Sequence, residues 1–534
     1  MTDAAGDSAV LPRTGADALA EALLGQAPEL VVFLVTGNQN LPLVDALGRC
    51  GVTMVHARHE SGAGYMAEGW ARSAGTPGVC LVTAGPGLTS ALTPLASARA
   101  AEVPLILLSA SHPREQDGHG AFQELDQTTL TRPLCKAAFR APYGACLGTL
   151  LTWAWQHATE FPPGPVHLEL PADTLTELVP ADEPLPPAPV PPGFYPVPAR
   201  GAADGSGDGA RAREIAAVLA AAQQPLVLLR PALGRSAQAA RLRALMPVLA
   251  VESPRGLRDP AWADEQATIA AADVIVLLGA ADYAVSFGRI GSADVHAWPD
   301  AGPASLGELA DLLDGRNGTA PRSGRLTSGS AEDGATRLLA NGGADLATGR
   351  MAGRPAHPLA VARIADRLVG DDDVLVIDGG EFCQWMRYGL RGRLGQQQVN
   401  GKLGAIGGGI PLGVGAALHA PGRRTVVFTG DGSFGYYGAE IDTAVRAGAR
   451  LTVVVGVDGC WASEWHQQIA HYDGRTYATG LRERRYGLVA QGYGARGSDA
   501  RDAGEFASLL AGALADPGVS CVSVRIERAA SPAS

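Results

Sequence analysis

Two aspartates in the last third of the chain have the type and spacing to hold a metal ion. Asp431 follows an apolar, β-branched run at 424–429, and Asp458 follows a second such run at 451–455. The segment 437–447 between them has the apolar spacing of a helix. The pattern predicts a strand–helix–strand unit with both aspartates at the carboxyl ends of neighbouring strands, where open α/β sheets bind ligands.

The chemistry of these loops favours a magnesium ion that holds a phosphate group. Asp458 lies 27 positions after Asp431 (458 − 431), and two carboxylates with a loop carbonyl are ligands that Mg²⁺ prefers. Gly432 and Ser433 open the predicted helix, whose first N–H groups can face an anion. The alternative is a turn with two solvated aspartates, and the second acidic loop at this spacing argues against it. We therefore expect Mg²⁺ and a diphosphate.

The run Gly430-Asp431-Gly432, with the second loop 27 residues later, resembles the signature of thiamine diphosphate (ThDP) enzymes. It is most similar to the acetolactate synthase and 2-oxo acid decarboxylase branch. In that family an Asp, an Asn and the carbonyl two residues after the Asn hold Mg²⁺. The resemblance implies that Asp431, Asp458 and the Cys460 carbonyl are the ligands here, with Trp461 beside them. Asp458 stands where the family has Asn, and it adds a negative charge near the diphosphate.

A second motif surrounds Glu60, where an extended run gives way to a helix rich in small residues. Read alone, Glu60 could be an acid at a helix N-terminus. The resemblance implies that it bonds to the aminopyrimidine ring of ThDP, so we expect Glu60 to be buried with a raised pKa. Gly62 and Gly64 would let another chain or a flat ring approach closely. In the family, this Glu and the diphosphate site come from different subunits, which implies a homodimer or homotetramer.

The resemblance assigns further residues to the cofactor. A bulky aliphatic side chain under the bent cofactor corresponds to Ile406, and the turn 82–87 lines the pyrimidine site. Without the resemblance, the segment 82–87 could be an ordinary turn. The glycine run 403–411 could be a dinucleotide-binding loop, but it lacks the strand and the acidic residue that accompany such a loop. The cofactor contacts implied in this way are Gly85, Gly380, Glu381, Phe382, Gly404 and Ile406.

Candidate residues for the reaction itself lie in three loops. Glu464 follows the second metal loop and is a candidate general acid/base, or else a solvated helix residue. The resemblance places Gln123 and Phe122 at the active site, where an ordinary surface loop is the alternative. Two amides, Asn38 and Gln39, fall where relatives shape the substrate pocket and indicate a polar substrate. The predicted set is Gln123 and Glu464 for catalysis and Asn38, Gln39, Phe122 and His466 for the substrate pocket.

The composition excludes several classes of protein. A net charge of −11 without a basic run argues against a nucleic-acid partner. Seven cysteines without a CxxC pair favour reduced thiols over a disulfide framework. No signal sequence and no apolar run of about 18–20 residues is seen. We expect a cytoplasmic protein that makes no membrane contact.

The alternation of strand and helix patterns predicts an α/β protein with three doubly wound parallel-sheet domains. The domains are expected at 12–180, 210–312 and 356–528, with linkers at 181–209 and 313–355. The resemblance makes them pyrimidine-binding, central and diphosphate-binding domains. The central unit shows no convincing pattern for FAD, so FAD binding is not expected.

These features predict a ThDP- and Mg²⁺-dependent enzyme. It would decarboxylate a 2-oxo acid and transfer the acyl-anion equivalent to a second carbonyl compound. One alternative is a lyase or decarboxylase without ligation, including one that cleaves a 2-hydroxyacyl-CoA thioester. Another is an inactive relative that only binds ThDP. A dinucleotide-binding oxidoreductase would need a cofactor loop that the sequence does not show.

Overall fold

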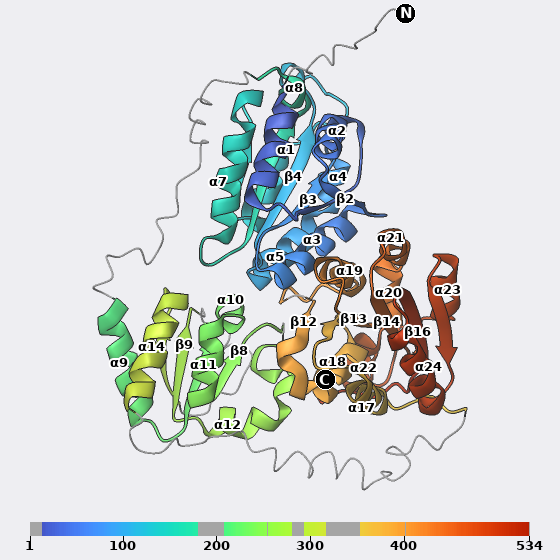
Figure 1. Ribbon diagram of the computed structural model, residues 1–534. Coiled ribbons are helices and arrows are strands. Elements are labelled where there is room, and N and C mark those ends of the chain that lie inside the picture. Colours follow the sequence, from blue (N-terminus) through green and yellow to red (C-terminus); the bar gives the residue numbers. More distant parts are fainter. Residues whose placement is uncertain are drawn as a thin grey trace, which may run out of the picture.

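Three parallel β-sheets, each covered by helices, make up the computed structural model (Figure 1). The structure describes residues 13–179, 208–253, 255–279, 293–316, 353–400 and 402–532. The sheets lie within residues 31–171, 225–298 and 374–525. The prediction of an α/β fold with three doubly wound parallel sheets is therefore confirmed. The predicted linkers lie almost wholly outside the described residues, and the exact domain boundaries remain predictions.

The first and third sheets share one strand order. The first runs β2-β1-β3-β4-β6-β5 and the third runs β12-β11-β13-β14-β16-β15, so each strand of the third corresponds to one of the first. Inner strands such as β1, β3 and β11 are buried on both faces, which explains why they read as continuous apolar runs. The strands of the first sheet are β1 (Val31–Leu34), β2 (Thr53–His56), β3 (Gly78–Val82), β4 (Leu105–Ser111), β5 (Ala137–Arg140) and β6 (Pro165–Pro171). Those of the third are β11 (Val374–Ile377), β12 (Gln397–Val399), β13 (Thr425–Gly430), β14 (Leu451–Val457), β15 (Arg496–Ala500) and β16 (Val519–Arg525).

Helices cover both faces of these two sheets. In the first unit they are α1 (Gly15–Gln26), α2 (Leu41–Arg49), α3 (Glu60–Ala74), α4 (Pro86–Ser90), α5 (Leu92–Ala101), α6 (Gln127–Thr131), α7 (Leu147–Thr159) and α8 (Ala172–Thr176). In the third unit they are α17 (Pro358–Leu368), α18 (Glu381–Gly389), α19 (Gly409–His419), α20 (Asp431–Tyr437), α21 (Glu440–Arg446), α22 (Ala462–His471), α23 (Tyr486–Gly492) and α24 (Ala503–Ala515).

The central unit is smaller, and its sheet has the order β10-β9-β7-β8. Its strands are β7 (Pro225–Leu229), β8 (Val248–Ala250), β9 (Val274–Leu278) and β10 (Asp294–Trp298). Its helices are α9 (Asp208–Ala221), α10 (Pro231–Gly234), α11 (Ala237–Leu245), α12 (Gln266–Ala271) and α14 (Pro303–Arg316).

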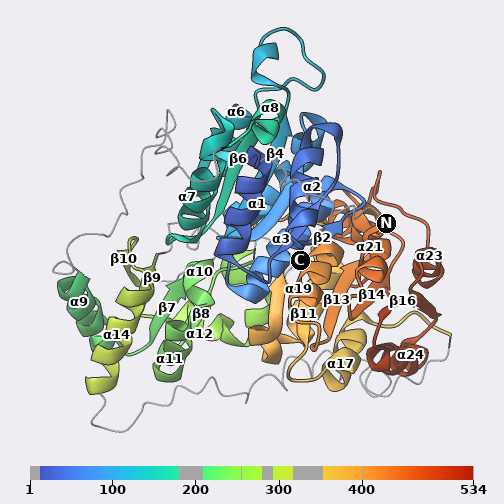
Figure 2. The same cartoon turned by 45° about the horizontal axis from the view of Figure 1, so that its top comes forward.

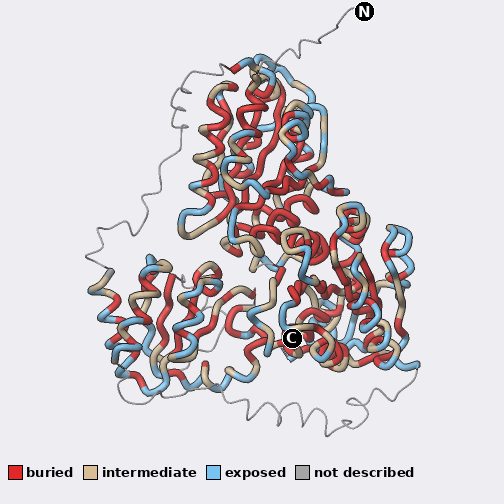
Figure 3. Tube along the Cα trace, in the orientation of Figure 1, coloured by how far each residue is buried: buried red, intermediate tan, exposed pale blue. Residues whose placement is uncertain are grey.

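Helices α3 and α19 join the first unit to the third, and they lie side by side in both views (Figures 1 and 2). A Cβ on Gly69 would lie 2.0 Å from the Leu412 carbonyl oxygen, and one on Gly415 would lie 1.9 Å from the Met66 oxygen. The two backbones therefore touch where only glycine fits. One apolar cluster runs through both units at this junction, and the chain there is largely buried (Figure 3).

Two local predictions are corrected by the structure. The helix expected at 437–447 begins earlier, because α20 starts at Asp431 and α21 follows from Glu440. Gly430 is extended at the N-cap, and Asp431 Oδ1 accepts the Gly432 N–H at 2.9 Å, which lets a helix start directly after the strand. Gly62 makes room neither for a ring nor for another chain. It faces the side chain of Glu440, since a Cβ there would lie 2.1 Å from Glu440 Oε1.

No helix in the described parts of the chain is long and apolar enough to cross a bilayer. All seven cysteines lie in described segments, and each is a free thiol.

Candidate functional site

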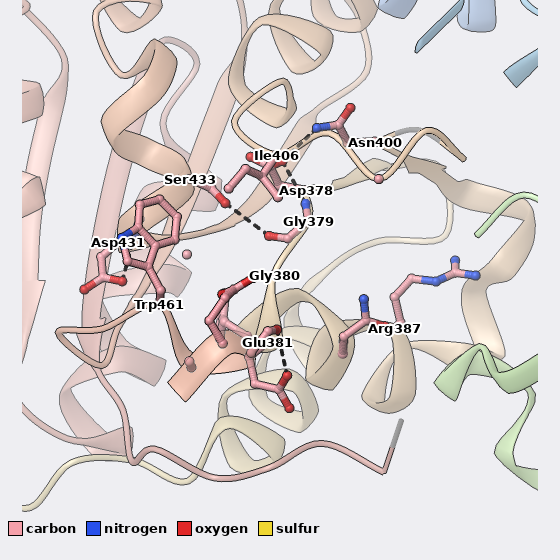
Figure 4. Close-up of a pocket in the computed structure, with 18 of the residues that line it drawn as sticks. Asp378, Gly379, Gly380, Glu381, Arg387, Asn400, Ile406, Asp431, Ser433 and Trp461 are labelled. Atoms are coloured by element: carbon pink, nitrogen blue, oxygen red, sulfur yellow. Dashed lines mark hydrogen bonds between the residues drawn. The ribbon is translucent and has the colours of Figure 1, made fainter. Parts of the chain in front are cut away.

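A cavity of about 230 Å³ opens at the carboxyl ends of β11, β12, β13 and β14 (Figure 4). The loops after these strands lie together because the strands are parallel neighbours in one sheet. We call this cavity the Asp431 pocket. The predicted site residues that line it are Gly380, Glu381, Phe382, Gly404, Ile406, Gly430, Asp431, Gly432, Ser433, Asp458, Cys460, Trp461 and Glu464.

Asp431 is buried at the start of α20, with 4% of its surface exposed. Its Oδ2 accepts the N–H of Gly459 at 2.9 Å, which ties the end of β13 to the loop after β14. Burial, together with the neighbouring charge of Asp458, raises the pKa of Asp431 to about 7. The carboxylate is thus poorly stabilised by the protein alone.

Asp458 lies opposite, in the loop between β14 and α22. Burial raises the pKa of Asp458 above its ordinary value. Its Oδ1 accepts a hydrogen bond from the Cys460 N–H at 2.9 Å, which lowers the pKa by a smaller amount. A buried carboxylate (Asp431) beside a half-buried one (Asp458) is costly without a compensating cation. No cluster of three His, Cys, Asp or Glu side chains suited to a metal occurs in the described chain. The donor set here therefore fits a cation that takes two carboxylates and completes its shell with a backbone carbonyl and ligand oxygens.

Small residues shape the wall around this acid pair. A Cβ on Gly432 would lie 2.6 Å from the Trp461 ring, so the ring packs directly over the start of α20. Ile406 has room because Gly379 has no side chain, and a Cβ there would lie 2.6 Å from Ile406 Cγ2. Ser433 Oγ donates to the Gly379 carbonyl at 3.1 Å, as drawn in Figure 4. These contacts place Ile406 and Trp461 on the cavity wall.

Asp378, at the end of β11, holds two of these loops together and was not among the predicted site residues. It is 3% exposed. Its Oδ1 accepts hydrogen bonds from Asn400 Nδ2, Gly379 N and Gly407 N at 2.8–2.9 Å. Its Oδ2 accepts one from Thr429 Oγ1 at 2.9 Å. Burial raises the pKa of Asp378. The signal in the sequence was an acid between a buried strand and two glycines.

Glu381 anchors another part of the wall. Its carboxylate accepts hydrogen bonds from Ser463 Oγ at 3.0 Å and from the backbone N–H of Ser531. Trp385 Nε1 donates to the Ala529 carbonyl at 3.0 Å, which holds the same segment against α18. Ala529 and Ser531 thus hold the segment after β16 against α18.

The central unit also contributes to the pocket, and sequence reasoning did not foresee this. Ser253 and Arg255 line it from the loop after β8. Arg387 of α18 lines it as well and forms a buried ion pair with Asp259 of the central unit at 2.7 Å. Its side chain is drawn in Figure 4. This ion pair fixes the central unit against the third unit.

A second group of predicted residues gathers at the carboxyl edge of the first sheet. Gln39 Oε1 accepts from Thr83 Oγ1 at 2.8 Å, and its Nε2 donates to Gln123 Oε1 at 3.1 Å. Gly85 has φ +56°, and a Cβ there would lie 2.8 Å from the Gln123 carbonyl. Glu60 begins α3, close to Gly87. We call Gln39, Glu60, Thr83, Gly85 and Gln123 the Glu60 cluster.

The backbone is strained at one residue of the Glu60 cluster. Gln123 has φ +63°, a left-handed conformation that non-glycine residues rarely adopt. Glu124 holds the loop by accepting the N–H groups of Gly118 and Ala121 at 2.6 and 2.9 Å. Phe122 projects outward with 75% of its surface exposed, and Asn38 is exposed nearby.

The two groups remain separate in one chain. None of the described residues that line the Asp431 pocket comes from 13–179. Glu60, expected to be buried, is only half-buried in the single chain. His466 does not line the Asp431 pocket, and its buried Nε2 has no hydrogen-bond partner among the described residues. Each half of the predicted site is assembled, but the halves do not meet.

Comparisons with known proteins agree with this arrangement. The N-terminal TPP binding domain of thiamine pyrophosphate enzymes matches residues 13–130, and the C-terminal TPP binding domain matches residues 378–524. A 2-hydroxyacyl-CoA lyase 2 of Danio rerio is 28% identical over 91% of this chain and 86% of its own. An acetolactate synthase large subunit of Mycobacterium tuberculosis is 29% identical over 87% of both chains. The isozyme 1 large subunit of acetolactate synthase from Escherichia coli is 26% identical over 96% and 94%. The chain belongs to the family of thiamine pyrophosphate enzymes, whose cofactor is also called thiamine diphosphate.

Proposed function

We propose that this protein is a ThDP- and Mg²⁺-dependent enzyme. It decarboxylates a 2-oxo acid and transfers the resulting acyl-anion equivalent to the carbonyl carbon of a second substrate. The observation that carries the proposal is the acid pair at the ends of adjacent parallel strands, in which Asp431 is buried and Asp458 is half-buried. The match of both TPP binding domains supports the same cofactor.

The residues of the Asp431 pocket would hold the cofactor. Asp431, Asp458 and the Cys460 carbonyl would bind Mg²⁺, and Gly432 and Ser433 would face the diphosphate. Ile406 would support the bent cofactor from the pocket wall. Bound ThDP supplies a nucleophilic carbon and an electron sink for the substrate carbonyl.

The remaining residues would move protons and orient the substrate. Glu60 would hold a proton against the pyrimidine ring, a role that requires a carboxyl group shielded from water. Glu464 lines the pocket at the first turn of α22 and would exchange protons with the substrate. The Gln39–Gln123 pair would present amide groups to a polar acceptor.

A lyase is the second candidate, because relatives that match most of the chain are named 2-hydroxyacyl-CoA lyase 2. Such an enzyme would cleave a carbon–carbon bond of a 2-hydroxyacyl thioester and release an aldehyde. Decarboxylation without ligation and ThDP binding without turnover are weaker candidates. Incubation with 2-oxo acids should give CO₂ and a ligated product, whereas aldehyde released from a 2-hydroxyacyl-CoA would favour the lyase.

Thermal unfolding with and without ThDP plus Mg²⁺ tests the cofactor directly. A ligand present at 100 times its Kd adds about 2.7 kcal/mol of stability, so a shift that needs both components is expected. Glu60→Gln should abolish turnover and keep most of this shift, whereas Glu505→Gln on the surface of α24 should change neither. A Glu60→Gln protein with full activity would contradict the assigned role.

We propose further that two chains complete each site, as a homodimer or homotetramer. The exposure of Phe122 and the half-burial of Glu60 support this arrangement, since both groups lie on a face that one chain leaves open. Glu60→Gln and Asp431→Asn proteins should each be inactive. Co-expressed in equal amounts, they should recover about a quarter of the wild-type activity, because half of the dimers are mixed and carry one intact site. No recovery would place the whole site in one chain.

The cytoplasmic location and the absence of nucleic-acid and membrane partners remain predictions from composition.

A further inference from the structure

Arg528 binds the metal loop from outside the pocket. It follows β16, and its Nε donates to the Asp458 carbonyl oxygen at 2.9 Å. Its Nη2 lies 3.5 Å from the Gly459 oxygen. Its guanidinium carbon lies 5.8 Å from the centre of the Trp465 ring in α22. The side chain thus connects the end of the loop to the helix that carries Glu464.

The same loop is held from two other directions. Asp431 Oδ2 accepts the Gly459 N–H at 2.9 Å, and the Leu481 N–H donates to the Gly459 oxygen at 2.7 Å. Trp461 N donates to the Thr479 oxygen at 2.7 Å. The loop therefore keeps hydrogen bonds to segment 479–481 without Arg528. What Arg528 adds that these bonds do not is a positive charge.

A positive charge matters here because the site carries an excess of negative charge. Asp431 and Asp458 together balance one Mg²⁺, so a bound diphosphate would bring further negative charge beside Asp458. Arg528 brings its positive charge to this loop through its contacts with the Asp458 and Gly459 carbonyls.

We propose that Arg528 is a positioning residue that offsets the charge of Asp458 against the diphosphate of ThDP. The inference rests on the proposed function, because it requires ThDP and Mg²⁺ at this site. Its consequence is a coupling between two residues. Arg528 should strengthen ThDP binding while residue 458 is a carboxylate, and should matter little when residue 458 is an amide.

The test compares wild type with Arg528→Gln, Asp458→Asn and the double variant. ThDP is titrated into each at saturating Mg²⁺ and one fixed pH, and binding is followed by calorimetry and by quenching of tryptophan fluorescence, because Trp461 lines the pocket. Arg528→Gln should weaken ThDP binding about three- to fivefold, the upper range for a solvent-exposed charge. In the Asp458→Asn background, Arg528→Gln should weaken ThDP binding by less than about 1.5-fold, because the interaction between the two charges is absent.

Two further proteins separate charge from structure. Arg528→Lys keeps the charge but loses the fork that reaches two carbonyls, and it should bind ThDP nearly as tightly as wild type. Arg501→Gln removes an exposed arginine that is paired with Glu505 in α24, and serves as the matched control. If Arg528→Gln does not fold, Arg528→Met removes the charge with a side chain of similar length and takes its place in both backgrounds.

The outcomes are distinct. The inference would be overturned if Arg528→Gln weakened ThDP binding equally in the wild-type and Asp458→Asn backgrounds, or in neither. A fivefold loss of ThDP affinity in Arg528→Lys would also overturn it. Failure of the wild-type protein to bind ThDP with Mg²⁺ would instead refute the proposed function.

Discussion

Replacing Asp378 should reveal how much the loops of the Asp431 pocket depend on one buried carboxylate. Asp378→Ala removes the acceptor of four donors at once, namely Asn400 Nδ2, Gly379 N, Gly407 N and Thr429 Oγ1. At about 1 kcal/mol for each hydrogen bond, the loss is roughly 4 kcal/mol. Burial raises the pKa of Asp378, so the carboxylate itself is disfavoured and its removal returns part of this energy. We expect a net destabilisation of about 2–3 kcal/mol.

Asp378→Asn is the matched comparison, because it changes only one oxygen. The amide oxygen can take the place of Oδ1 and keep three of the four hydrogen bonds. The amide nitrogen then faces Thr429, whose hydroxyl can rotate to accept instead of donate. The cost should be about 1 kcal/mol or less.

Two measurements check this pair. Thermal unfolding should show Asp378→Ala about 5–10 °C below wild type, if the third unit unfolds as a domain of ordinary size. Hydrogen exchange should show lost protection in 400–407, because Gly407 N–H and Asn400 lose their partner. Equal stability of the Ala and Asn proteins, with unchanged exchange in that segment, would show that Asp378 does not hold the loop.

Three other predictions follow from the geometry. Without a cation, Asp431 has a raised pKa in the folded protein and therefore ionises at lower pH in the unfolded chain. The free energy of unfolding should then fall as pH rises from about 4 to about 7. Thermal unfolding in EDTA across this range should show a smaller fall in stability for Asp431→Asn. Gly69→Ala should separate α3 from α19 and lower the melting temperature, whereas Gly512→Ala in α24, with open space around it, should be neutral or stabilising by up to about 1 kcal/mol. Arg387→Met leaves Asp259 buried without its ion pair and should cost about 3 kcal/mol in denaturant unfolding; a loss below about 0.5 kcal/mol would mean that the pair contributes nothing net.

The parts of the fold that the sequence predicted well are those set by local pattern. β13 and β14 cover nearly the same residues as the apolar runs at 424–429 and 451–455, because a strand buried on both faces needs mostly apolar residues. The Asp431 pocket followed from the same logic, since acids directly after parallel strands must meet at one sheet edge.

The parts that the sequence could not predict depend on contacts between distant segments. Glu440 accepts the N–H of Arg58 across 382 positions, and no local pattern in α21 indicates that partner. Arg255 lines the pocket because the central unit packs against the third unit, and the buried Arg387–Asp259 ion pair holds the two units together. The early start of α20 was missed because Gly-Asp-Gly has low helix propensity, although Asp431 Oδ1 accepts the Gly432 N–H in the first turn.

The glycines at the junction of α3 and α19 connect these contacts to the proposed assembly. Backbone touches backbone at Gly69 and Gly415, so neither helix can turn or shift without a clash. The first unit is thereby fixed on the third in an orientation that leaves its Glu60 cluster off the Asp431 pocket of the same chain. On the proposed function, a cofactor that contacts both Glu60 and Asp431 would need a second copy of the chain. The glycines would then serve the active site without lining its pocket, because they hold the two halves of one chain apart.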